Sequence, residues 1–338
     1  RTGRKKMKGN RKESDAGVCK TEKKRYFCSS LPARGIPEKV NPAVTGERSS
    51  MTFENLHNLN SNSMKAIRLI ALAACMAATL DASAQEQEIR LFSHRGGRME
   101  HDENTFSAFQ ASYDAGYRGF ETDIRMTRDG ALVITHDSSL ERTTNGTGTV
   151  EEKTEAEIRQ LATKQGNKMM FLDELLEFLE GKEGLYVEFE MKTKPEALYP
   201  EERLHAYCDK LYDAVMAVKP ADATFVFTSG DYRGLRYLQA KHPGVDLLLI
   251  TSKPCNDETI DLCKAMGIKR MGATMDGTSR KAVKKAHKEG LIVSLWPGQS
   301  VEDFMLGAYL GCDYMCTDVP IEVKGWLAEK APWIKVKY

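Results

Sequence analysis

The chain has 338 residues, with 49 Lys/Arg and 48 Asp/Glu, and a net charge of +1. Residues 1–84 hold 16 of the basic and 7 of the acidic residues, so 33 and 41 remain and residues 85–338 carry a net charge of −8. An acidic domain without basic clusters gives no support for nucleic-acid binding.

The first 84 residues have the pattern of an export signal preceded by extra sequence. Residues 1–63 are Lys/Arg-rich and lack apolar periodicity, so we expect upstream sequence translated from a misplaced start, or a disordered segment. Residues 64–84 combine a basic start, the apolar run Leu69–Leu80 and an Ala-x-Ala end, which predicts a secretory signal peptide. The apolar run is too short for a membrane span, which needs about 20 residues. Residues 85–338 are then periplasmic or secreted, with a lipoprotein anchored at Cys75 as the minor alternative.

From residue 89 onward, strand-like apolar runs alternate with amphipathic helical stretches. We expect strands at 89–96, 120–127, 132–137, 185–192, 224–229, 245–251, 268–273, 291–296 and 312–318. We expect helices at 105–116, 154–163, 172–181, 201–218, 232–242, 256–267, 279–290 and 300–311. Continuous apolar strands between helices indicate a parallel sheet that is covered on both faces.

Roughly eight β/α units in one domain predict an α/β fold of the TIM (β/α)8 barrel type. An open doubly wound sheet is the alternative, but no Gly-rich nucleotide loop follows the first strand. The polar stretch Asp137–Thr154 is expected to be a loop insertion near the barrel mouth. The sequence leaves open whether Cys255 and Cys263 form a disulfide.

Carboxylates gather at the ends of two predicted strands. Glu121 and Asp123 point to one face because side chains alternate along a strand, and Glu188, Glu190 and Lys192 share a face of a later strand. Carboxylates side by side repel each other unless a cation lies between them. Each group also has a purely structural interpretation; Lys192, for example, could simply neutralise Glu190. The functional interpretation fails only if the structural interpretation is right for every one of these groups.

Two imidazoles accompany the carboxylates. His94 and Arg95 end the first predicted strand, and His136 ends the run 132–137. Since active sites of barrels lie at the carboxyl ends of the strands, these groups are expected to meet at one mouth. Two imidazoles, a guanidinium and a carboxylate cluster are typical of a metal-assisted phosphoester site.

The motif HRGG…ENT..AF..A…G…E.D…T.DG..V..HD..L.R.T.G.G, continued by Glu190-x-Lys192, resembles the glycerophosphodiester phosphodiesterase family from about Leu91 to Pro320. The resemblance implies a TIM barrel and metal-assisted hydrolysis of glycerophosphodiesters to glycerol 3-phosphate and an alcohol. It also implies roles for individual residues: His94 and His136 as the acid–base pair, Arg95 and Lys192 near the phosphate, and Glu121, Asp123 and Glu190 as metal ligands.

Other positions near these motifs have a functional and a structural interpretation. Glu103 stands in the family's Glu-Asn-Thr segment and is expected to approach the site, whereas Asn104 and Thr105 are interpreted as helix N-cap residues. Trp296 ends a predicted strand and would form either an apolar wall for the glycerol or part of the core. The family often has Ser-Phe at Ser229-Gly230 and Trp-Thr-Val-Asn from Trp296 onward, so the pocket for the alcohol group is expected to differ.

The expected function is therefore hydrolysis of small glycerophosphodiesters with one divalent cation, Ca²⁺ or Mg²⁺, both of which suit oxygen ligands. Two alternatives stay open: a phospholipase D/C-like phosphodiesterase on the same barrel, and a catalytically silent protein that binds phosphate esters. The sequence does not tell which histidine is the acid, whether water or a neighbouring hydroxyl attacks, which alcohol is preferred, or the oligomeric state.

Overall fold

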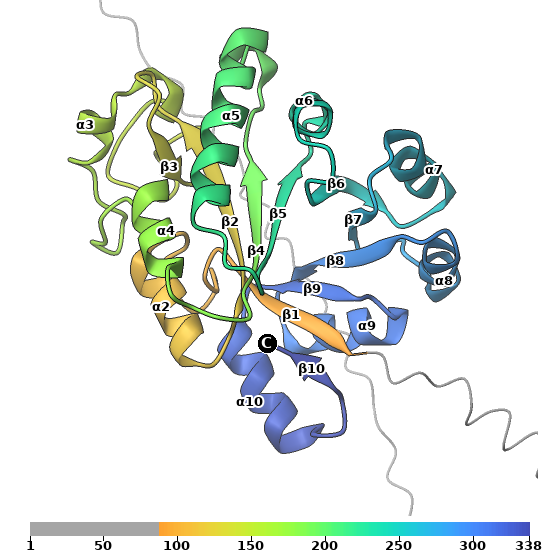
Figure 1. The fold of residues 1–338 in the computed structure, drawn as a ribbon. Helices are drawn as coiled ribbons and strands as arrows, with labels where there is room; N and C mark the ends of the chain where they lie inside the picture. The colour runs from red at the N-terminus through yellow and green to blue at the C-terminus, as the bar shows by residue number, and fades with distance from the viewer. Residues whose placement is uncertain (1–87) are drawn as a thin grey trace, which may run out of the picture. The chain divides into compact units, whose positions relative to one another are not determined.

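The computed structural model describes residues 88–338; residues 1–63 and the expected signal peptide 64–84, with Cys75, lie outside this range. Eight parallel strands of the described range close into a barrel, because β1 pairs with β9 on one side and with β2 on the other. The TIM-barrel prediction is confirmed (Figure 1). The barrel strands are β1 (Ile89–His94), β2 (Gly119–Met126), β4 (Tyr186–Met191), β5 (Thr224–Ser229), β6 (Leu247–Pro254), β7 (Arg270–Thr274), β8 (Ile292–Gly298) and β9 (Tyr314–Thr317).

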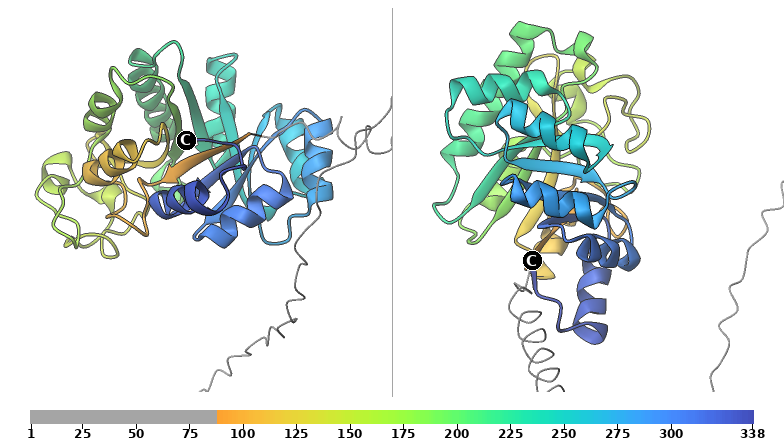
Figure 2. Two further views of the ribbon diagram at one scale, coloured as in Figure 1. Left: turned by 90° about the horizontal axis from the view of Figure 1, so that it is seen from below. Right: turned by 90° about the vertical axis from the view of Figure 1, so that its right-hand side faces the viewer.

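The helices alternate with the barrel strands and lie outside them (Figure 2). They are α2 (Phe106–Asp114), α3 (Glu155–Ile158), α4 (Leu172–Leu179), α5 (Glu201–Ala217), α6 (Tyr232–Lys241), α7 (Asp257–Met266), α8 (Arg280–Lys288), α9 (Val301–Leu310) and α10 (Pro320–Lys330), with 3₁₀ turns η2 (Val150–Glu152) and η3 (Glu196–Leu198). The helix expected at 154–163 is wrong beyond Ile158. The backbone N–H of Ala162 donates instead to the side chain of Asn145, which draws the chain out of the helix.

Two short strands extend the sheet beyond the barrel. β3 (Leu132–Ile134) runs antiparallel to the outer end of β2, and β10 (Val336–Lys337) runs parallel to β1. The chain after β3 forms the expected polar insertion, which borders the barrel mouth where Arg142 contacts Glu103. A separate small apolar cluster supports this segment: Ala131, Val133, Leu140, Val150, Ile158, Met169 and Phe171.

The alternation of side chains along the strands divides the core into two parts. On β4, Val187, Phe189 and Met191 join the large apolar cluster between barrel and helices, while Tyr186 packs inside the barrel. Glu188 and Glu190 share the inward face with Tyr186, because they lie two and four residues further along the strand. The inward face of the barrel therefore changes from apolar to acidic toward the mouth.

The described cysteines are all free thiols. Cys255 and Cys263, the pair that could have formed a disulfide, are both buried and unbonded. No helix among residues 88–338 is long and apolar enough to cross a membrane.

Candidate active site

The three predicted metal ligands converge at the barrel mouth. Asp123 on β2 lies directly opposite Glu190 on β4, and Glu121 shares the face of Asp123. One carboxylate oxygen of each residue lies within 4.8 Å of the other two. Glu121 and Asp123 are buried and Glu190 is half-buried, so a cation held by all three would be open to a ligand on one side.

The electrostatics of these carboxylates favour a bound cation. Burial and the neighbouring negative charges of Asp123 and Glu190 raise the pKa of Glu121 well above its usual value. Burial alone would also raise the pKa of Asp123, but Arg95 and Lys192 hold it below the usual range. Glu121 Oε2 accepts from the backbone N–H of Arg95 at 3.2 Å, whereas the buried Oε1 has no hydrogen-bond partner. A divalent cation would satisfy that oxygen and neutralise the cluster, so these residues fit Ca²⁺ or Mg²⁺.

Two basic side chains, Arg95 and Lys192, flank the carboxylates. Arg95 Nε lies 3.0 Å from Asp123 and Nη1 donates to Glu103 at 3.1 Å. Lys192 Nζ lies 2.6 Å from Glu190 and 3.3 Å from Asp123. Burial alone would lower the pKa of Lys192, but the charges of Glu190 and Asp123 raise it, so the ammonium group stays charged. The side chains expected near the phosphate therefore lie beside the candidate metal ligands.

His94 ends β1 and is held by a carboxylate that was not expected from the sequence. Its Nδ1 lies 2.5 Å from Asp318, the residue after β9, and Asp318 is fully buried. With the Nδ1 proton donated to Asp318, the opposite Nε2 accepts from Arg95 Nε at 3.1 Å. Nε2 also lies 3.6 Å from Glu121. Arg98 binds the second oxygen of Asp318 at 2.7 Å and so fixes this carboxylate in place.

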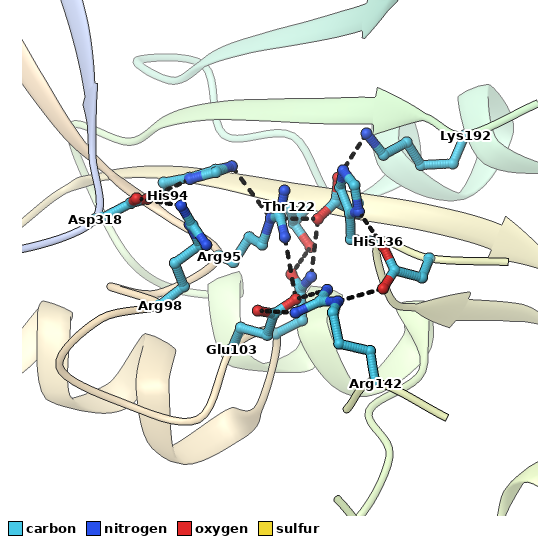
Figure 3. A network of polar contacts seen from close by, with 12 residues as sticks. His94, Arg95, Arg98, Glu103, Thr122, His136, Arg142, Lys192 and Asp318 are labelled. Carbon is cyan, nitrogen blue, oxygen red and sulfur yellow. Dashed lines mark hydrogen bonds and ion pairs between the residues drawn. The ribbon is translucent and has the colours of Figure 1, made fainter. Parts of the chain in front are cut away.

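His136 approaches the site from the insertion. Its Nδ1 lies 2.6 Å from Asp137, which also binds Arg142, and Arg142 forms two hydrogen bonds with Glu103. Because Glu103 contacts Arg95, a continuous chain of ion pairs links the two sides of the mouth (Figure 3). Burial lowers the pKa of His136, an effect that the charge of Asp123 opposes.

The interpretation of Asn104 as a capping residue is wrong. Thr105 caps α2 by accepting from the N–H of Ala108, but Asn104 has φ +59° and donates from Nδ2 to Asp123 at 2.9 Å. Thr122 Oγ1 also lies 3.4 Å from Asn104 Oδ1. Asn104 therefore positions a candidate metal ligand, and its left-handed backbone turns the side chain inward.

A cavity of about 170 Å³ opens at this mouth. Polar groups line one side, including His94, His136 and Lys192, and Trp296 lines the other with Leu248 and Ile250. Trp296 is half-buried and its Nε1 has no hydrogen-bond partner, so of the two expected positions it takes the cavity wall. A cavity of this size with one polar and one apolar side suits a glycerol phosphate group.

Sequence reasoning missed several contributors to this site. Asp318 follows the last barrel strand, and the general rule that strand ends carry function was a sufficient signal for it. Arg142 lies in the polar insertion with nothing in the sequence to pair it with Glu103, 39 residues away. No local pattern distinguishes Asn104 from an ordinary capping residue.

Comparisons with known proteins show the family of this chain by sequence and support its fold by structure. Residues 94–322 match the model of the glycerophosphoryl diester phosphodiesterase family. The chain is 37% identical over 123 residues to a glycerophosphodiester phosphodiesterase of Caldanaerobacter subterraneus subsp. tengcongensis, which covers 34% of this chain and 50% of that protein. A Bacillus altitudinis protein of the same name is 24% identical over 68% of this chain and 95% of its own length. The fold is similar to an Oleispira antarctica phosphodiesterase solved with the product sn-glycerol-3-phosphate: TM-score 0.64, 20% identity, 71% of this chain and 97% of that one.

Proposed function

Because the chain belongs to the glycerophosphoryl diester phosphodiesterase family, we propose that it hydrolyses small glycerophosphodiesters to glycerol 3-phosphate and an alcohol, with one divalent cation. The observation that carries this proposal is the arrangement at the barrel mouth. Three carboxylates within 4.8 Å of one another share a cavity with two imidazoles, and each imidazole has its own carboxylate partner.

Glu121, Asp123 and Glu190 would hold the cation, Ca²⁺ or Mg²⁺. When bound, it would polarise a phosphoryl oxygen and offset the charge of the transition state. Arg95 and Lys192 border the same volume and bind the remaining phosphoryl oxygens. Their positive charges stabilise the negative charge that develops as the attacking oxygen approaches phosphorus.

The two histidines supply proton transfer in this scheme. His94 lines the cavity and acts as the base, because Asp318 accepts its Nδ1 proton and so leaves the acceptor lone pair on Nε2, which Arg95 Nε must release before proton transfer. His136 also lines the cavity and protonates the oxygen of the departing alcohol; Asp123 and the hydrogen bond with Asp137 favour its protonated form against the effect of burial. Each positioned acid or base contributes roughly 10²–10⁴-fold to the rate.

The test is release of glycerol 3-phosphate from glycerophosphocholine, with and without a chelator, for the wild type and His94→Ala. We expect release that stops with chelator and returns with Ca²⁺ or Mg²⁺, and a loss of at least 10²-fold for His94→Ala. His287→Ala is the matched control, since His287 pairs with Asp313 away from the mouth. If the wild type releases glycerol 3-phosphate equally fast with and without the chelator, then the proposed role of the metal is refuted.

Two further measurements separate the alternatives. Hydrolysis of intact phospholipid alone, without release from glycerophosphodiesters, would favour the phospholipase interpretation. Elemental analysis of the purified protein identifies the cation, since calcium and magnesium both suit three carboxylates.

We also propose that the domain acts outside the cytoplasm. The support is the sequence pattern of residues 64–84, with its basic start, apolar run and small-residue end. N-terminal sequencing of protein recovered from the exported fraction should give a start after Ala84. A lipid-modified start at Cys75 would establish the lipoprotein alternative, and an uncleaved cytoplasmic chain would contradict export.

A further inference from the structure

A second hollow, here called the outer groove, adjoins the catalytic cavity. It measures about 400 Å³ and shares His136, Glu190 and Lys192 with the cavity, so a bound diester can extend from one into the other. Its other walls come from the insertion, from the end of β2 and from the ends of β4 and β5 with the loops that follow them; they include Arg125, Asp137, Lys194 and Asp231.

The walls of the outer groove are tied together by Arg125. Its Nε donates to the carbonyl of His136 at 2.9 Å, and its Nη1 donates to the carbonyls of Lys192 and Lys194 at 3.2 and 3.3 Å. An ion pair with the buried Glu151 at 2.8 Å holds the guanidinium itself. The groove therefore has a fixed shape between the insertion and the loop after β4.

Nearly every charge that lines the outer groove is already balanced by the protein. Arg125 pairs with Glu151, as described above, and Glu190 pairs with Lys192. The other acidic groups are neutralised from outside the groove, Asp137 by Arg142 and Asp231 by Arg233.

Lys194 is different. Its side chain is exposed, and no hydrogen bond or ion pair of its ammonium group occurs within residues 88–338. The groove thus offers a ligand one unbalanced positive charge. It has no Phe, Tyr or Trp among its lining residues, and the faces of these rings are what bind quaternary ammonium groups.

We propose that the outer groove receives the alcohol group of the diester and that Lys194 selects alcohols that carry a second anionic group. This inference rests on the proposed glycerophosphodiesterase function. The cavity of about 170 Å³ takes the constant glycerol phosphate part, and the adjoining groove takes the part that varies between substrates. A phosphate or carboxylate on the alcohol then lies near Lys194, whereas a trimethylammonium group meets a positive charge and no Phe, Tyr or Trp ring.

The test compares kcat/KM for three substrates whose alcohols differ in charge: glycerophosphocholine, glycerophosphoglycerol and bis(glycerophospho)glycerol, with the last value halved for its two equivalent bonds. An exposed ion pair contributes up to about 1 kcal/mol, so we expect the wild type to prefer the anionic over the cationic alcohol by about two- to fivefold. Lys194→Gln should remove most of this preference through KM, and Lys194→Glu should reverse it. The preference should shrink as salt is added.

Lys284→Glu is the control, because it makes the same change in net charge on an exposed residue of α8. It should leave the order of substrates unchanged. A wild type that prefers the cationic alcohol, or an order that Lys194→Glu does not alter, would overturn the inference while leaving the hydrolytic function intact. Failure to hydrolyse any of the three substrates would instead refute the proposed function.

Discussion

Asp318→Asn tests whether the buried carboxylate behind His94 is needed to position it. The variant keeps the size of the side chain but removes the negative charge 2.5 Å from Nδ1. A hydrogen bond to a charged group contributes about 1.5–3 kcal/mol, and about 1.4 kcal/mol corresponds to a tenfold change. We therefore expect kcat/KM to fall roughly 10- to 150-fold, mainly in kcat, because Asp318 is expected to act through His94 and not on the substrate.

The assay is release of glycerol 3-phosphate under saturating Ca²⁺ or Mg²⁺, together with thermal unfolding to confirm that the variant is folded. Asp313→Asn is a close control, since Asp313 precedes β9 and binds His287 at 2.9 Å, at the opposite end of the same strand. That variant should keep its activity. If folded Asp318→Asn stays within threefold of the wild type, then the carboxylate does not orient the base.

Three more outcomes follow from the described contacts. Saturation of the wild type with cation at 100 times Kd should raise Tm by roughly 5–10 °C in thermal unfolding, and Glu121→Gln should abolish that rise. Asp231→Asn should cost about 1.5–3 kcal/mol in urea unfolding at pH 7, because Asp231 binds Arg233 and its pKa lies below the usual value. The deficit should shrink below about pH 4, where the wild-type carboxylate also becomes protonated. Asn104→Ala should weaken cation affinity measured by calorimetry, since Asp123 loses its donor; unchanged affinity would contradict the positioning role.

Much of the barrel could be predicted, because its strands are apolar runs separated by helices with clear ends. The antiparallel direction of β3 could also be predicted from the sequence. Only five residues, 127–131, join β2 to β3, and a parallel connection needs a dozen or more. The end of α3 was not accessible in the same way, because a contact with Asn145 replaces the helical hydrogen bond of Ala162.

In the candidate site, too, contacts within one strand could be predicted from the sequence, whereas contacts between distant strands could not. Glu121 and Asp123 share a face by the geometry of a strand alone, so their approach needed no tertiary information. The pairing of His94 with Asp318 spans 224 residues and depends on the closure of β1 against β9. The predicted barrel implies that closure, and the position of Asp318 after a strand marks it as a candidate, but no sequence pattern indicates that its carboxylate pairs with His94.

The segment that begins with β3 is separate from the barrel in its packing. The three carboxylates lie on barrel strands, but His136 lies on a segment with its own apolar cluster, residues 131–171. Replacing that segment would exchange the proposed acid His136 and one wall of the outer groove, while the three candidate cation ligands would stay in place.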